Sequence, residues 1–302
     1  MINVNLRRLL LRLRLADGIG IRGENRIYNW LQAHPNRAKH LLPNQLATIA
    51  ELTDRHRVRF CAHFVSQQLS ERVQQHVAQL SFITILDQAY PAQLREGYLP
   101  PIVLFYQGDI SLLRADRLLA VIRARDGNGY AQRALEQLIP PLISEQVIVV
   151  SGLARGVDSL GHRVTLKSGG RSIGVIGTGL DQVYPGENRR LQTYMAEHEL
   201  VISEYGLGAV GKPHHFVERN RIIAGLVQAL LVVQAKSRSG SLITANLALQ
   251  NNRNVLALPG RVDDPLSVGC NELILAGAKP VLTAIHVLEE LPELAVKTGK
   301  PI

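Results

Sequence analysis

The chain has 302 residues, of which 46% are hydrophobic and 20% charged, and this size suits one large or two ordinary globular domains with an ample core. Its net charge is +9, and only seven of its 34 basic residues are lysines. Arginines favour bidentate contacts to phosphates, although an ordinary basic surface would give the same count. No apolar run approaches the roughly 20 residues of a membrane span, and the N-terminus lacks the apolar core of a signal peptide. Cys61 and Cys270 lie far apart without metal-type spacing, so we expect a cytoplasmic protein with free thiols and no membrane association.

Residues 1–80 are predicted to form a small helical domain, because the leucines between Leu6 and Leu15 roughly follow helical spacing. Further helices are expected at 26–31, 45–55 and 65–80. The turn at 17–20, Asp-Gly-Ile-Gly, resembles a helix-hairpin-helix motif, whose turn amides bind a DNA backbone. A helical bundle with a plain glycine turn explains the same residues, and the shortness of the motif favours that alternative.

Residues 81–114 are expected to form a connector, since Tyr90-Pro91, Pro100-Pro101 and Gly108-Asp109 punctuate them. One short strand is predicted inside this segment, at 102–105.

From 115 to 291, short apolar runs alternate with helical segments. The runs lie at 118–122, 147–150, 172–176, 200–203, 229–233, 255–258 and 280–282. Runs without polar alternation are typical of strands that are buried on both faces of a parallel sheet. With right-handed crossovers, the pattern predicts an α/β fold: an extended Rossmann-like, doubly wound, mostly parallel sheet after the helical domain. Residues 292–302 are expected to form a polar tail.

The loops that follow these runs should meet at one edge of the sheet, where ligands of such folds bind. Small residues that allow close backbone approach occur there together with Arg and Lys, at 151–158, 177–181, 204–216, 236–241 and 259–261. Ser239-Gly240-Ser241 opens a helix and aims amide groups at an anion, and Arg219-Asn220-Arg221 precedes it. A tight turn explains each glycine alone, but together the loops predict a face that binds nucleic-acid phosphates.

Several residues on this face allow two interpretations. His214-His215 could bind a metal or act as a base, but no cysteine or carboxylate stands at useful spacing, which favours surface or stacking roles. Asp158 could be a base, although a partner role toward an arginine or the backbone fits its place in a predicted helix better. Phe216 is equally consistent with stacking on a base and with anchoring the core.

Motifs across roughly 90–285 occur in a characteristic order. They are SGLARGVD at 151–158, His162, IGTGLD at 176–181, Tyr184-Pro185, Asn188, Ser203-Glu204, FVERNRIIAGL at 216–226, SGSLITA at 239–245, Pro259-Gly260 and GCNELI at 269–274. Together they resemble the DNA-processing protein A (DprA/Smf) family. The resemblance implies a homodimer that binds single-stranded DNA, protects incoming DNA and helps to load a RecA-type recombinase during natural transformation, without known enzymatic activity. It also implies a sterile-alpha-motif-like domain, which fits residues 1–80, and a dimer contact near 266–275, through Leu266, Val268, Leu273 and Ile274.

Two features depart from the family pattern. The first strand of the family usually ends in Gly-Ser-Arg, whereas Arg123-Ala124 precede Arg125 here, and Tyr130 follows as in the pattern. The side chain of Arg123 would either obstruct a phosphate or replace amide donors with a guanidinium. Many members also end in a winged-helix-like domain, and the residues after Leu291 are too few to form one.

The predicted interface combines these observations, and no catalytic residue, metal or cofactor is expected. Phosphate contacts, close backbone approach and base stacking are assigned to Arg125, Gly152, Arg155, Gly177, Gly179, Lys212, Phe216, Arg219, Asn220, Arg221, Ser239, Gly240 and Ser241. One alternative is a Rossmann-like enzyme of the nucleoside-monophosphate phosphoribohydrolase type, but the loop 239–247 lacks the glutamate that would act on the sugar. The other is a scaffold that has lost DNA affinity.

Overall fold

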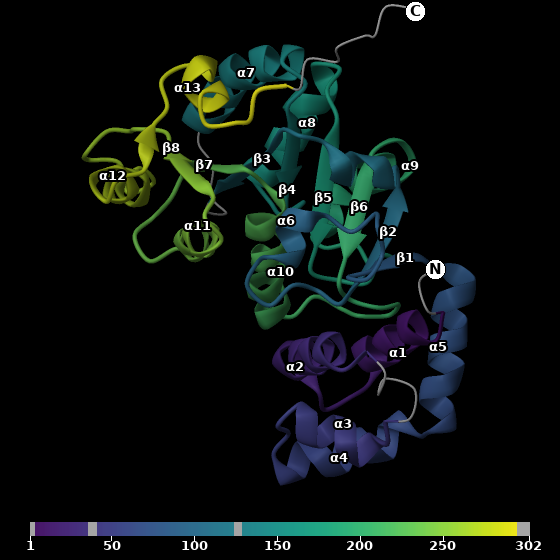
Figure 1. The fold of residues 1–302 in the computed structure, drawn as a ribbon. Coiled ribbons are helices and arrows are strands. Elements are labelled where there is room, and N and C mark those ends of the chain that lie inside the picture. Colours follow the sequence, from purple (N-terminus) through teal and green to yellow (C-terminus); the bar gives the residue numbers. More distant parts are fainter. Residues whose placement is uncertain (1–3, 36–40, 124–128, 295–302) are drawn as a thin grey trace, which may run out of the picture.

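The computed structural model describes residues 4–35, 41–123 and 129–294. Its N-terminal part, here called the helical unit (residues 4–79), contains α1 (Val4–Leu15), α2 (Gly20–Ala33), α3 (Pro43–Ile49), α4 (Asp54–Phe64) and α5 (Gln67–Gln79) (Figure 1). Local signals set some of these boundaries: the Oγ of Ser66 accepts a hydrogen bond from the Leu69 amide at 3.1 Å and so caps α5. Leu10, Ile27, Leu46 and Phe60 are buried in its core, which confirms the predicted helical region.

A nine-stranded sheet forms the rest of the fold. Its strand order is β1-β2-β6-β5-β4-β3-β7-β8-β9, and the seven strands from β3 to β9 run parallel. The bounds are β1 (Ser81–Thr84), β2 (Val103–Gly108), β3 (Leu118–Arg123), β4 (Ile148–Ser151), β5 (Ser172–Ile176), β6 (Leu200–Ser203), β7 (Ala229–Gln234), β8 (Asn254–Ala257) and β9 (Lys279–Pro280). The prediction of a mostly parallel α/β sheet is therefore confirmed.

Residues 81–114 do more than connect two parts of the chain. β1 and β2 pair antiparallel, and β2 pairs antiparallel with β6. The carboxylate of Asp87 fixes the turn after β1 by accepting hydrogen bonds from the amide and hydroxyl of Thr84 at 2.7 and 3.1 Å. The sequence predicted a connector with one strand at 102–105, and β2 confirms that strand. The segment also contributes β1, and it contains α6 (Ala92–Arg95) between the two strands and the short helix Ile110–Arg114 after them.

Helices cover both faces of the sheet, as the doubly wound prediction requires. Leu119 and Val121 of β3 pack in one core with α7, α8 and α13, whereas Ala120 and Ile122 pack in the other core with α10 and α11. The helices are α7 (Gly129–Ser144), α8 (Val157–Lys167), α9 (Arg189–His198), α10 (Pro213–Leu226), α11 (Gly240–Gln250), α12 (Val268–Leu275) and α13 (Ala284–Leu288). Within the described ranges, no helix is long and apolar enough to cross a membrane.

The strand order reverses between β3 and β7, which pair with each other in the middle of the sheet. A crevice forms at such a reversal beyond the carboxyl ends of the strands. Arg125 and Ala124 lie outside the described residues, so the structure places neither side chain.

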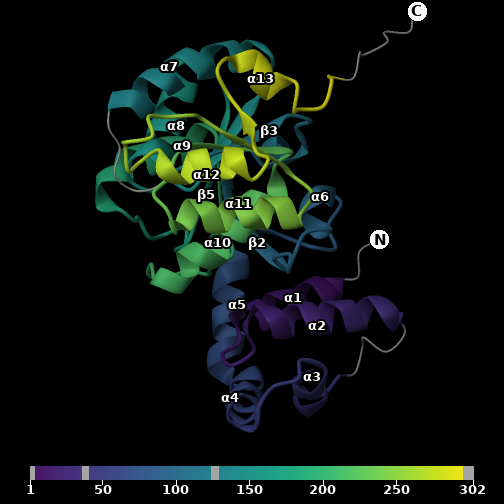
Figure 2. The ribbon, with the colours of Figure 1, turned by 90° about the vertical axis from the view of Figure 1, so that its left-hand side faces the viewer.

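The helical unit packs against the sheet domain (residues 81–291) on the side of β1, β2 and the segment after β6. The guanidinium of Arg7 pairs with Asp87 at 3.2 Å, and the side-chain amide of Asn25 donates to the Pro100 carbonyl at 3.1 Å. In both ribbon views α10 lies between the sheet and the helical unit (Figures 1 and 2). The helix that carries Phe216, Arg219 and Arg221 is thus held from two sides.

Candidate nucleic-acid interface

We call the loops at the carboxyl ends of β4 to β8 the rim (residues 152–156, 177–188, 204–212, 235–239 and 258–267). Two predicted phosphate contacts, Arg155 and Lys212, are exposed on it. The guanidinium of Arg155 is 64% exposed and lies 3.1 Å from the carboxylate of Glu187. Such an exposed pair contributes little, from about 0 to 1 kcal/mol, so a phosphate can compete for this arginine. Lys212 is the N-cap residue of α10, and its backbone is extended before Pro213.

Phe216 lies on the rim as half of an aromatic pair. Its ring centroid is 5.1 Å from that of Tyr184, which is 52% exposed. A Cβ at Gly177 or Gly211 would approach the Phe216 ring to 3.0 or 2.9 Å, so these glycines make room for the ring rather than for a ligand. Tyr184 was not among the predicted contacts, although its Tyr-Pro motif lies in the rim loop 177–188 together with the predicted Gly177 and Gly179. The pair presents a half-buried ring and an exposed one.

Arg219 points into the fold, contrary to the expectation of a phosphate contact. It is 5% exposed, and its Nη1 donates to the carbonyls of Gly152 and Val175, while its Nε donates to the Asn220 side chain at 3.1 Å. A Cβ at Gly152 would overlap this guanidinium, so Gly152 accommodates Arg219 and not a ligand. Burial raises the pKa of the neighbouring Asp158 carboxyl, and this carboxylate accepts the Gly152 amide at 3.2 Å. Asp158 therefore has the partner role that its position favoured.

Arg221 and Gly179 also have internal roles. Arg221 is 6% exposed and pairs with the fully buried Glu204. A Cβ at Gly179 would come within 2.5 Å of the Gly206 carbonyl oxygen, and the Gly179 amide donates to the Ala209 carbonyl at 2.8 Å. The arginine pair that the sequence assigns to phosphates is thus part of the framework beneath the rim.

Two serine hydroxyls stand at the N-terminus of α11. The hydroxyl oxygens of Ser239 and Ser241 are buried and have no hydrogen-bond partner among the described residues. A Cβ at Gly240 would meet open space, and Lys236 and Arg238 are exposed just before this turn. The N-terminus of a helix carries partial positive charge, so this end of α11 suits an anion.

The two histidines differ in burial. His214 is exposed, whereas the ring of buried His215 stacks on Tyr205 with centroids 4.0 Å apart. Its Nδ1 lies 3.2 Å from the Gly177 carbonyl. Across the described residues, no group of three His, Cys, Asp or Glu side chains could hold a metal ion.

Comparison with known proteins decides the family. The family model described as DNA recombination-mediator protein A matches residues 81–292. The chain belongs to this family. It is 46% identical to the DNA processing protein DprA of Streptococcus pneumoniae over 68% of this chain and 73% of that protein, and 40% identical to DprA of Bacillus subtilis over 74% and 75%. These matches confirm the resemblance to DprA.

Solved DprA structures share the fold. The crystal structure of DprA from Streptococcus pneumoniae covers 93% of this chain and 96% of its own, with a TM-score of 0.85 and 36% identity. A DprA structure from Helicobacter pylori, whose title concerns its single-stranded DNA binding mode, covers 71% of this chain and 99% of its own, with a TM-score of 0.63 and 26% identity.

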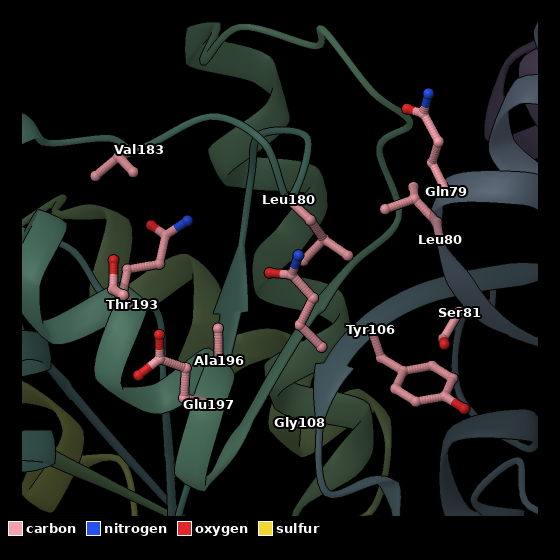
Figure 3. Close-up of a pocket in the computed structure, with 12 residues that line it drawn as sticks. Gln79, Leu80, Ser81, Tyr106, Gly108, Leu180, Val183, Thr193, Ala196 and Glu197 are labelled. Carbon is pink, nitrogen blue, oxygen red and sulfur yellow. The ribbon is translucent and has the colours of Figure 1, made fainter.

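One pocket of this DprA family member borders the rim loop 177–188 where that loop faces the end of α5 and the start of β1. It measures about 510 Å³ and is bounded by Leu180 and Val183, by α9 and by the start of β1 and the end of β2 (Figure 3). Its polar lining is neutral except for the Glu197 carboxylate. A carboxylate would repel phosphates, so we place the nucleic-acid interface on the rim and not in this pocket.

Proposed function

We propose that this protein binds single-stranded DNA on its rim, protects incoming DNA and helps to load a RecA-type recombinase, in the cytoplasm and during natural transformation. The observation that carries the proposal is the arrangement on one edge of the sheet: exposed cations, an aromatic pair and a helix N-terminus whose two serine hydroxyls have no partner among the described residues. Membership in the DNA recombination-mediator protein A family supports it, as does the single-stranded DNA binding named for the relative from Helicobacter pylori.

The rim suits a flexible strand. Arg155 and Lys212 would neutralise phosphates, the N-terminus of α11 would receive another phosphate, and Phe216 with Tyr184 would stack on a base. Contacts of this kind read charge and the faces of bases, so they do not select a sequence. Arg125 remains a proposed contact in the loop outside the described residues.

The direct test is titration of a labelled oligo-dT with the full chain. Lys212→Ala should weaken binding, whereas Lys167→Ala should not, because Lys167 is an exposed lysine at the far end of α8. Equal affinities of the two variants would remove Lys212 from the interface. Failure of the wild-type chain to bind would favour the scaffold that has lost DNA affinity.

The recombinase is proposed as a partner in the same assembly. A pull-down of a RecA-type recombinase should recover this protein, and adding single-stranded DNA tests whether the strand bridges the two. Capture neither with nor without DNA would contradict a loading role.

We propose no catalytic activity, because the loop 239–247 carries no carboxylate that could act on a nucleotide sugar. Incubation with AMP should release no free adenine, and detectable adenine would restore the phosphoribohydrolase alternative.

A homodimer is proposed through the end of the sheet domain. The expected apolar face at 266–275 is turned differently from the prediction: Leu273 is buried in the core and Ile274 packs against it, whereas Leu275 is 89% exposed. Val262, Leu282 and Ile285 are also exposed in this part of the chain. A second copy of the chain would cover these side chains.

A further inference from the structure

We propose that the helical unit holds the DNA-binding rim in its binding position, with Arg14 as the positioning residue. This inference rests on the proposed function of the rim. It assigns to α1 and α5 a role in affinity although neither helix carries a predicted DNA contact.

The contact is a buried cluster of four charges at the junction of the two parts. The Nη1 of Arg14 lies 3.2 Å from a carboxylate oxygen of Glu24 and 3.3 Å from one of Glu204. Arg221 of α10 pairs with the same oxygen of Glu204. The side chains of Glu24 and Glu204 are 1% and 0% exposed, so the two carboxylates depend on the arginines for charge compensation.

Such a cluster is sensitive to the loss of any member. Removing one partner of a buried ion pair leaves an uncompensated charge in a region of low dielectric, and that is strongly unfavourable. Without Arg14, Glu24 would lose its ion pair and Glu204 would keep only Arg221, so we expect the joint to loosen. Glu204 directly follows β6, and Arg221 belongs to α10, so an opened joint moves both sides of the rim loop 204–212.

A second set of contacts leads from the helical unit into the same loop. The Nε2 of His76 on α5 accepts the Leu207 amide at 2.9 Å. A Cβ at Gly206 would overlap this nitrogen and come within 2.8 Å of Leu15. The loop is therefore shaped against α1 and α5.

From the loop, contacts pass to the DNA-binding end of α10. The Tyr205 hydroxyl donates to the Glu218 carboxylate, and the Tyr205 ring stacks on His215 at 4.0 Å. His215 precedes Phe216, and Lys212 ends the loop. A shift of residues 204–207 would thus displace the aromatic pair and the lysine together.

The experiment compares Arg14→Met with Arg26→Met, in full-length chains at pH 8. Arg26 lies in the same helical unit but pairs with Glu51 there, at 2.7 Å, away from the joint. We expect Arg14→Met to melt cooperatively and to bind oligo-dT about tenfold more weakly, within the usual range for coupling between sites, and Arg26→Met to bind like the wild type. Arg14→Lys should retain most of the affinity. Adding Glu24→Gln to Arg14→Met removes the negative charge that lost its partner, and it should recover part of the affinity for oligo-dT.

Hydrogen exchange without DNA supplies a readout that does not depend on the proposed function. Amides at 204–218 should exchange faster in Arg14→Met than in Arg26→Met. Unchanged exchange and unchanged affinity would overturn the inference while leaving DNA binding intact, whereas a wild type that binds no oligonucleotide would overturn the proposed function. If Arg14→Met fails to fold, His76→Phe replaces it in the same two measurements, because it removes the acceptor of the Leu207 amide on the α5 side of the joint.

Discussion

Phe216 is half-buried, with Gly177 and Gly211 close to its ring and the exposed Tyr184 ring 5.1 Å away. We expect Phe216→Ala to weaken binding of oligo-dT by about 1–3 kcal/mol, the usual value of one stacked base. Tyr194→Ala is the matched control, since Tyr194 is a partly exposed ring on α9 that stacks on His198. Equal affinities of the two variants in fluorescence titrations would show that no base stacks on Phe216.

Arg155 and Arg219 were both predicted to contact phosphates, but alanine at the two positions should have different effects. Arg155→Ala should weaken oligonucleotide binding by roughly 1–3 kcal/mol and leave the melting temperature unchanged, because Arg155 is exposed and its ion pair with Glu187 is exposed as well. Arg219→Ala should destabilise the fold by about 3–5 kcal/mol, since it strips two buried carbonyls and Asp158 of their partner. Thermal unfolding separates the two effects, and a stable, binding-deficient Arg219→Ala would contradict the buried role.

Glu24 should give the fold a recognisable dependence on pH. Burial raises the pKa of its carboxyl from 4.5 to about 7, with Arg14 opposing the shift. Between these values the folded protein binds more protons than the unfolded chain, so the contribution of Glu24 to stability falls as pH rises through this window. The free energies of unfolding of the wild type and Glu24→Gln, measured with denaturant, should therefore be similar near pH 4.5. As the pH rises to about 7, that of the wild type should fall relative to that of the variant. Parallel curves would place the Glu24 pKa near its ordinary value.

At the scale of elements, α12 and the segments around it expose apolar side chains that a single chain leaves in water. Light scattering should give about twice the 33.3 kDa chain mass at tens of micromolar. Leu275→Glu should produce a monomer, because a carboxylate in the contact is costly to desolvate. Val58→Glu, at an exposed valine of α4, should leave the dimer intact. A wild-type monomer at this concentration would contradict the assembly.

The strands β4 to β7 could be predicted from the sequence because each follows a short apolar run and is buried along its length in the structure. β1 has no such run, and prolines around it concealed its pairing with β2. The helix expected at 45–55 is divided into α3 and α4 because the chain turns at Glu51, whose φ is 54°. A local sequence pattern does not show which distant segments pair, so it predicts neither β1 nor the division between α3 and α4.

The candidate site was predicted in its location but not in the orientation of its side chains. Glycines and arginines do gather at the carboxyl ends of the strands. Arg219 occupies the space beside Gly152, however, and the same residue types would also have suited a phosphate there. Burial depends on which loops meet, so a single sequence does not separate Arg219 from Arg155.

For the molecule as a whole, the affinity for single strands should fall steeply with salt. Each phosphate contact to single-stranded DNA contributes about 0.7 to the slope of log K against log salt. Lys212→Ala should therefore flatten the slope by about 0.7, and Lys167→Ala should leave it unchanged. A slope near zero for the wild type would exclude a binding mode governed by phosphates.

The antiparallel edge of the sheet has a consequence for how the chain is made. β2 is complete near residue 108, but its neighbour β6 begins at Leu200, and His76 finds its donor 131 residues later in the chain. Contacts of such sequence separation are slow to form because long loops must close first. During synthesis from the N-terminus, the five helices can fold early, whereas Leu207, which belongs to their docking surface, is made 131 residues after its partner His76. We therefore expect the helical unit to dock onto the sheet domain late in folding, so that an incompletely synthesised chain does not yet bind DNA.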